Sequence, residues 1–112
     1  MNLKGKTFRA VSNSAQGSVG TNTKMQFISD KGVVAAKYKG GTIVRGHVLG
    51  RRISESEIEL LYLSATVSGE VKAGKAHAKF TLGEDKKLHM HMDWQWLTGD
   101  HSSGQSEWVL ER

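Results

Sequence analysis

A run of strict alternation near the C-terminal end most constrains what this chain can fold into. From Leu88 to Trp96 the sequence reads Leu-His-Met-His-Met-Asp-Trp-Gln-Trp, so that large apolar residues occupy every second position. Only a β-strand directs successive side chains to opposite faces with this period. The run therefore predicts a strand with one buried face and one solvated face.

The same pattern along the chain predicts eight strands joined by short connections. Their ranges are 6–13, 21–28, 33–39, 42–50, 57–64, 74–82, 87–97 and 105–112, with turns at 14–17, 29–32, 51–56 and 83–86. Gly40-Gly41 indicates a hairpin, because tight two-residue turns need positive φ. The segment 57–64 also fits a short helix, since Ser54 and Glu57 have the spacing of a capping box. Its alternating apolar residues favour a strand.

Two hairpins specify a register. Pairing 74–82 with 87–97 places small residues opposite large ones, and the predicted pairs are Leu82–Leu88, Phe80–Met90, Ala78–Met92 and Ala76–Trp94. A slip of one residue would move every side chain to the wrong face. A similar pairing of 42–50 with 57–64 predicts that Val48 lies opposite Leu60 and that Gly46 lies opposite Tyr62.

Sequential antiparallel strands form either a sandwich or a closed barrel. The chain of 112 residues contains no proline, a residue that sheets confine to edges and bulges. This absence favours a closed barrel, which has no edges. We therefore predict an all-β fold, an antiparallel eight-stranded up-and-down β-barrel that forms a single domain over residues 1–112. The interior of an eight-stranded barrel holds packed side chains or one small ligand. The alternating pattern does not distinguish these two possibilities.

Composition bears on the compartment. The chain has no cysteine, which excludes disulfides and thiolate metal sites and fits a reducing environment. No apolar run approaches the ~18 residues of a membrane span. The first nine residues are polar and basic, without the apolar stretch of a secretory signal. We expect a cytoplasmic protein that does not engage a membrane.

Three motifs carry a resemblance that spans nearly the whole chain. They are Asn2-Leu3-x-Gly5-Lys6-Thr7-Phe8, Tyr38-x-Gly40-Gly41-x-Ile43-x-x-Gly46-x-x-x-Gly50 and Trp94-Gln95-Trp96-x-x-Gly99-Asp100-x-Ser102-Ser103-Gly104-x-Ser106. Together they resemble a family of small bacterial proteins that often carry the label N-acetylglutamate synthase. The resemblance implies a compact β-barrel of the lipocalin/avidin-like kind, and it supplies no catalytic residues.

The inward face of the predicted barrel contains the candidate pocket wall. Aromatic and methionine side chains gather there, and we predict that the wall consists of Tyr62, Met90, Met92, Trp94 and Trp96. Such side chains line apolar ligand pockets, with methionine adapting to the ligand. The alternative is a plain packed core, because aromatic residues also bury the most area.

The polar connection after the tryptophans is the candidate mouth of the pocket. Asp100, Ser102 and Ser103 have oxygen atoms that would bind the polar part of a ligand. The alternative is a hairpin turn with local Asx- and Ser-type hydrogen bonds. A catalytic triad of Ser102, His101 and Asp100 is disfavoured, because adjacent residues of one loop do not supply the geometry of nucleophile, base and orienting acid.

Three histidines are weak candidates for metal ligands. His89 and His91 share the polar face of one predicted strand, and His77 lies on the paired strand opposite Asp93. Imidazole and carboxylate groups bind zinc, but these positions lie ~7 Å apart along the strands. We therefore predict no metal site, and a solvent-facing polar stripe with a His77–Asp93 charge pair is the alternative.

Function follows from this architecture as a set of hypotheses. We expect a non-enzymatic binder of a small, partly apolar molecule, without a cofactor. The alternative is a solid barrel that pairs with a copy of itself or with another protein, with Leu61, Leu63 and Trp108 facing outward. An acetyltransferase is the third hypothesis, and it is disfavoured because no glycine-rich loop opens a helix that would hold acetyl-CoA.

Nucleic acid is not an expected partner. The net charge is +5, and a basic chain attracts polyanions. Binding to nucleic acid needs a clustered basic surface and often exposed aromatic side chains. The aromatic residues are predicted to face inward, and the sequence does not gather Arg9, Lys24, Arg45, Arg51 and Arg52 into one patch.

Overall fold

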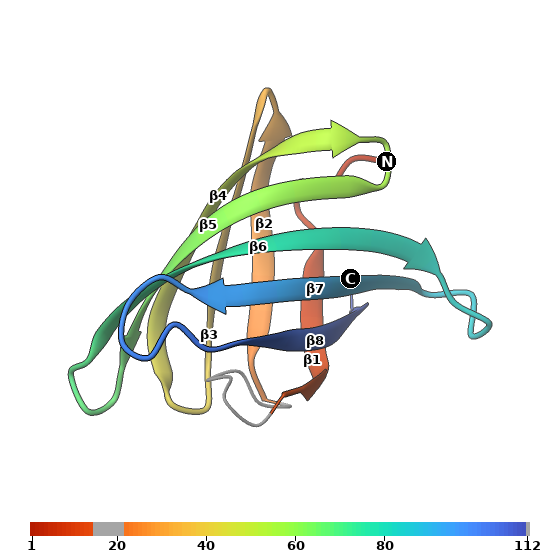
Figure 1. Ribbon diagram of the computed structural model, residues 1–112. Helices are drawn as coiled ribbons and strands as arrows, with labels where there is room; N and C mark the ends of the chain where they lie inside the picture. The colour runs from red at the N-terminus through yellow and green to blue at the C-terminus, as the bar shows by residue number, and fades with distance from the viewer. Residues whose placement is uncertain (15–21, 112) are drawn as a thin grey trace.

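The computed structural model describes residues 1–14 and 22–111 as a closed antiparallel barrel in which the strands follow one another in sequence order (Figure 1). This confirms the predicted eight-stranded all-β barrel. The strands are β1 (Thr7–Asn13), β2 (Lys24–Lys31), β3 (Val33–Gly40), β4 (Ile43–Ser54), β5 (Glu57–Thr66), β6 (Val71–Leu82), β7 (Leu88–Trp96) and β8 (Ser103–Leu110). In the described part, no helix is long and apolar enough to cross a membrane.

The strand boundaries differ from the predictions mainly in β4 and β6. The predicted turn at 51–56 is wrong, because β4 continues to Ser54 and the hairpin closes at residues 55–56. Residues 57–64 belong to β5, so the helical alternative is wrong as well. The start of β6 at Val71 shortens the predicted connection before it. Residues 15–17 of the turn predicted at 14–17, and the predicted start of the second strand at 21, lie outside the described residues.

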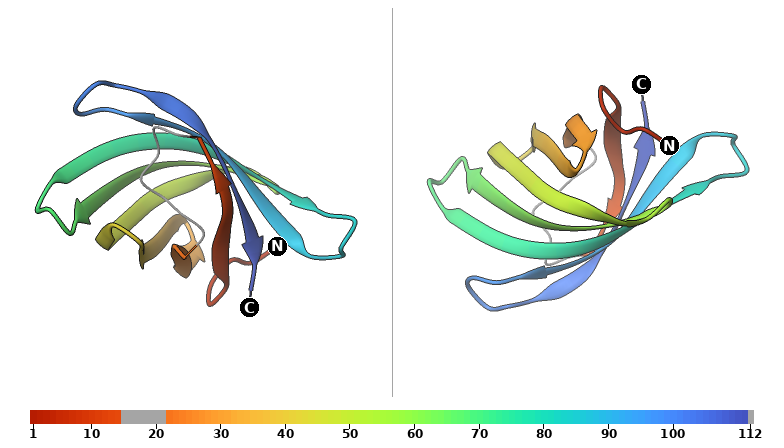
Figure 2. Two further views of the ribbon diagram at one scale, coloured as in Figure 1. Left: turned by 90° about the horizontal axis from the view of Figure 1, so that it is seen from below. Right: turned by 90° about the horizontal axis from the view of Figure 1, so that it is seen from above.

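The register of β6 and β7 matches the prediction at every pair. Ala76 lies opposite Trp94, Ala78 opposite Met92, and Phe80 opposite Met90. A small side chain thus faces a large one at two successive layers, which fills the narrow interior without overlap. The four longest strands, β4 to β7, sweep around one side of the barrel (Figure 2).

The register predicted for β4 and β5 is wrong by two residues. Val48 lies opposite Tyr62, and Leu60 lies opposite Gly50. The reason is the length of β4, which runs beyond the predicted turn and contains irregular pairing near its end. The space for the Tyr62 ring comes instead from Gly74 of β6, where an added Cβ would lie 2.3 Å from Tyr62 Cζ.

One end of the barrel is closed by apolar packing. The rings of Phe8, Phe27 and Phe80 meet edge to face, with centroids 5.7, 5.7 and 6.3 Å apart. Leu3 precedes β1 and is fully buried in the same core cluster. Figure 1 shows both chain termini toward this end, away from the β3–β4, β5–β6 and β7–β8 connections.

A buried carboxylate holds the N-terminal segment at the closed end. Asp30 accepts hydrogen bonds from the Leu3 backbone N–H at 2.7 Å and from Arg52 Nε and Nη2 at 2.9 and 2.6 Å. Arg52 also donates to the carbonyl oxygen of Met1 at 2.6 Å. These contacts join the N-terminus, β2 and β4, because the guanidinium presents its donors in a fixed planar array.

Trp108 faces inward, and its predicted outward position is wrong. Its side chain lies between Ala10 of β1 and Met90 of β7, which are its partners in the neighbouring strands. Only 1% of its surface is exposed. The inward face of β8 therefore carries Ser106 and Trp108.

Candidate ligand cavity inside the barrel

A small cavity lies inside the barrel toward the end that is opposite the phenylalanine cluster. Its volume is about 40 Å³. Every strand except β6 contributes side chains to its lining, which is mostly aromatic and aliphatic. The lining residues are Asn13, Met25, Tyr38, Ile43, Val48, Leu60, Tyr62, Met92, Trp94, Trp96, Ser106 and Trp108.

Four of the five predicted wall residues line this cavity. They are Tyr62, Met92, Trp94 and Trp96. Met90 does not line it, because this residue lies one inward layer closer to the phenylalanine cluster, opposite Phe80. Most of the lining residues that were not predicted follow the inward alternation of their strands, which was the only signal for them. Asn13 and Ile43 lie beyond shifts in register, so alternation gave no signal for these two.

Two of the three tryptophans have a fixed indole orientation. Trp94 Nε1–H donates to Asn13 Oδ1 at 2.9 Å, and Trp108 Nε1–H donates to Ser106 Oγ at 3.0 Å. The first bond joins β7 to Asn13 at the end of β1, and the second lies within β8. A buried indole N–H normally has such a partner.

Trp96 is the exception. Its buried Nε1–H has no hydrogen-bond partner within residues 1–14 and 22–111. The ring itself is held in place by Tyr62, whose centroid lies 5.2 Å away in an edge-to-face arrangement, and by Lys72 Nζ at 4.1 Å from the indole centroid. A buried donor without an acceptor is costly, so this N–H marks the position that an acceptor atom of a ligand or a water would occupy.

Among the described residues that line the cavity, none carries an ionised group. Burial raises the pKa of Tyr38 to about 12, and burial also raises the pKa of Tyr62, so both phenols are neutral near pH 7. The remaining polar atoms of the lining belong to amide, hydroxyl and indole groups. A charged ligand would lose its hydration without gaining a counterion. The site therefore favours a neutral molecule.

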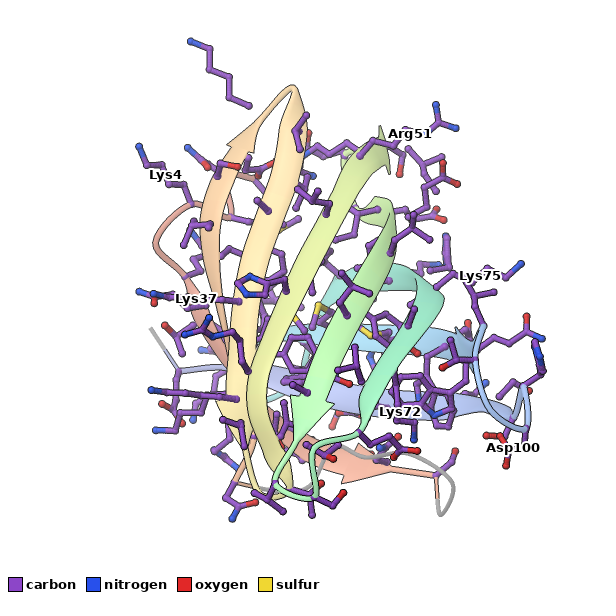
Figure 3. The ribbon with its side chains drawn as sticks, turned by 90° about the vertical axis from the view of Figure 1, so that its left-hand side faces the viewer. Lys4, Lys37, Arg51, Lys72, Lys75 and Asp100 are labelled. Carbon is purple, nitrogen blue, oxygen red and sulfur yellow. The ribbon has the colours of Figure 1, made fainter. Side chains whose placement is uncertain are left out.

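The three residues predicted at the mouth do not line the cavity. Asp100 is exposed on the β7–β8 connection, which projects from the barrel wall (Figure 3). It accepts a hydrogen bond from the Ser102 backbone N–H at 2.9 Å, and this bond holds the pKa of its carboxyl below the usual range. Ser103 is exposed at the start of β8. The β7–β8 connection thus has the local hydrogen bonds of a hairpin turn, which was the alternative to a pocket mouth.

The histidines lie on the outer wall with carboxylate partners. His77 Nε2 bonds Glu57 Oε2 at 2.7 Å, whereas Asp93 accepts from Gln105, so the predicted His77–Asp93 charge pair is wrong. The reason is that His77 also has a neighbour on β5, where the Glu57 side chain reaches the ring.

His89 lies between two carboxylates. It bonds Asp85 and Glu107 at 3.0 Å through its two ring nitrogens, and these bonds raise its pKa. His91 stacks on it with ring centroids 6.3 Å apart. Among the residues that the structure describes, no group of three or more His, Cys, Asp or Glu side chains could hold a metal ion.

The comparison with known proteins agrees with the barrel fold. The model of the family described as avidin-like protein matches residues 1–110. No curated protein and no solved structure matches the chain. Because the family match covers nearly the whole sequence and the fold is a closed eight-stranded barrel, the chain belongs to the avidin-like protein family.

Proposed function

We propose that this protein binds a small, neutral, partly apolar molecule in the cavity inside its barrel, without catalysing a reaction on it. An avidin-like barrel fits a small-molecule binding protein. The observation that carries the proposal is the buried Trp96 Nε1–H, which has no acceptor among the described residues and belongs to a mostly apolar lining. An acceptor atom on the ligand would complete this hydrogen bond while its apolar part contacts Tyr62 and Trp94.

The size of the cavity limits how a ligand enters. A volume of about 40 Å³ holds about three water molecules, since one water needs roughly 10–15 Å³ by this measure. Drug-sized ligands occupy sites of about 300 Å³ or more. A larger ligand must therefore displace side chains, and Met25 and Met92 are the lining residues that change rotamer most readily.

Native mass spectrometry of freshly purified protein tests this proposal. We expect a mass that is lost on denaturation, and we expect Trp96→Phe to reduce the occupied fraction, because it removes the N–H and keeps an aromatic ring. The loss of one hydrogen bond should weaken the affinity for the ligand by up to about tenfold. All three tryptophans line the cavity, so quenching of the intrinsic emission on adding the released compound gives a second readout.

The control variant is Leu61→Ala, on the outer wall, which should retain the compound as the wild type does. A wild-type chain without bound mass, and without an emission change in a screen of small neutral molecules at millimolar concentration, would contradict the proposal. Acetyl-CoA, which is charged, is tested in a separate titration, because the sequence resembles chains labelled N-acetylglutamate synthase.

A second candidate function is self-association through the outer face of β4 and β5. Leu49 and Leu61 are direct partners across these strands, and Leu61 and Leu63 are 60% and 54% exposed. Neighbouring exposed leucines are typical of protein interfaces. Sedimentation velocity should then show a mass that rises with concentration, and Leu61→Lys should abolish the rise. A monomer at all concentrations would exclude this function.

A further inference from the structure

We propose that the outer face of β1 to β4 is a second site, which binds the sugar-phosphate backbone of duplex nucleic acid. This face lies on the outside of the barrel wall, so the proposal is independent of ligand binding inside. The site consists of basic side chains from four strands. These residues are far apart in the sequence, and strand pairing brings them together. They are Arg9, Lys24, Lys37, Lys39 and Arg45.

Strand pairing arranges these side chains in rows. Arg9 is the direct partner of Lys24, and Lys24 is the direct partner of Lys39, so three cations lie side by side across β1, β2 and β3. One step along the strands, Lys37 pairs with His47 of β4. Adjacent strands are ~4.8 Å apart, which gives a dense array of positive charge. Figure 3 shows Lys37 pointing away from the barrel on this side.

An irregularity in β4 adds Arg45 to the array. Pairing with β5 shifts between Ile43 and Arg45, and Val44 and Arg45 are both exposed although they are adjacent. A bulge of this kind directs consecutive side chains outward and bends the strand. The outer surface next to it is a groove of about 590 Å³, whose lining includes Lys24, Lys37, Lys39 and Arg45.

The charge of this face is only slightly compensated. Lys37, Lys39 and Arg45 form no ion pair within the ranges 1–14 and 22–111, and Arg9 and Lys24 share the single carboxylate of Glu111 at 3.3 and 3.1 Å. By contrast, the arginines at the closed end have carboxylates of their own, as in the pairs Arg51–Glu59 and Arg52–Asp30. This face therefore carries positive charge that neighbouring carboxylates offset only in part.

The side chains of this outer face indicate which class of polyanion it binds. All eight Phe, Tyr and Trp residues of the chain are buried, so the barrel offers no exposed ring of these types on which unpaired bases would stack, and single strands lose their main contact. An anionic membrane would need apolar side chains inserted beside the charges, and Val44 is the one exposed aliphatic residue among the described residues that line the groove. A duplex presents closely spaced phosphates that cations alone bind, without sequence selectivity.

The test is the salt dependence of binding to a fluorescently labelled random-sequence DNA duplex, measured by anisotropy between about 50 and 200 mM NaCl. If Lys24, Lys37, Lys39 and Arg45 each neutralise one phosphate, the slope of log K against log salt is about −3.6. The variant Lys37→Gln/Lys39→Gln/Arg45→Gln should reduce the magnitude of this slope by about 2.7. Its affinity at the lowest salt should fall at least tenfold.

The matched control removes the same charge elsewhere. Lys75→Gln/Lys79→Gln/Lys87→Gln changes three exposed lysines outside this face, and it should keep the slope and stay within about threefold in affinity. Near-UV circular dichroism confirms that both variants are folded. Equal losses in the two variants would overturn the proposal, as would the absence of duplex binding at the lowest salt. Binding to phosphatidylserine vesicles in preference to the duplex would overturn it as well.

Discussion

Trp108→Ala should lower the free energy of unfolding by about 3–5 kcal/mol, the range for deleting a fully buried large aromatic side chain. The residue is 1% exposed and lies between Ala10 and Met90. Its indole N–H also bonds Ser106 Oγ, so the variant leaves a hydroxyl without its donor as well as an enlarged cavity. Urea unfolding followed by far-UV circular dichroism measures the change.

The control for this prediction is Leu82→Ala. Leu82 is 73% exposed, and a surface substitution of this kind stays within about 0.5 kcal/mol. If the two variants lost the same stability, Trp108 would face solvent, and the register of β8 against β1 and β7 would be incorrect. The comparison therefore tests the closure of the barrel as well as the role of one side chain.

Asp30→Ala should lower the free energy of unfolding at neutral pH by about 3 kcal/mol, the lower end of the range for breaking a buried ion pair. The Asp30 side chain is 2% exposed, whereas Arg52 is 26% exposed and regains some hydration in the variant. The Leu3 backbone N–H also loses its acceptor, and the N-terminal segment is expected to loosen. Thermal or urea unfolding measures the loss.

The pH dependence of this effect has a defined sign. Hydrogen bonds from Arg52 hold the pKa of Asp30 below its ordinary value of 3.8. The stability that Asp30 contributes is therefore fully present above its unfolded-state pKa, and it is lost as the pH falls through the lower folded-state pKa. The difference between wild type and Asp30→Ala should be constant near neutral pH and should shrink in acid.

Glu59→Ala is the control for Asp30→Ala. Glu59 pairs with Arg51, and both side chains are largely exposed, so we expect a loss of no more than about 1 kcal/mol. A loss for Asp30→Ala that is no larger than that for Glu59→Ala, or that is independent of pH down to pH ~3, would contradict the role assigned to this carboxylate at the closed end.

The candidate site was predictable from the sequence only in part. Alternation places Met90, Met92 and Trp94 on the inward face, and the structure agrees for all three. Alternation does not predict how far along the barrel axis each side chain lies, because that position depends on the stagger between strands. Met90 consequently belongs to the packed end while Met92 lines the cavity. The hydrogen-bond partners Asn13 and Ser106 carry no local signal of their role.

The sequence by itself determined the number of strands, the inward face of β7 and the register of β6 with β7, because side-chain period and the fit of small against large residues are local properties. Only the tertiary structure decided the register of β4 with β5, since the length of β4 and its irregular pairing depend on both neighbouring strands.

The tertiary structure also decided which distant residues meet. Barrel closure buries Trp108 between β1 and β7, and it assembles Arg9, Lys24 and Lys39 into one row on the outer face. These neighbours are set by pairing between strands that are remote in sequence, and no local pattern encodes that pairing.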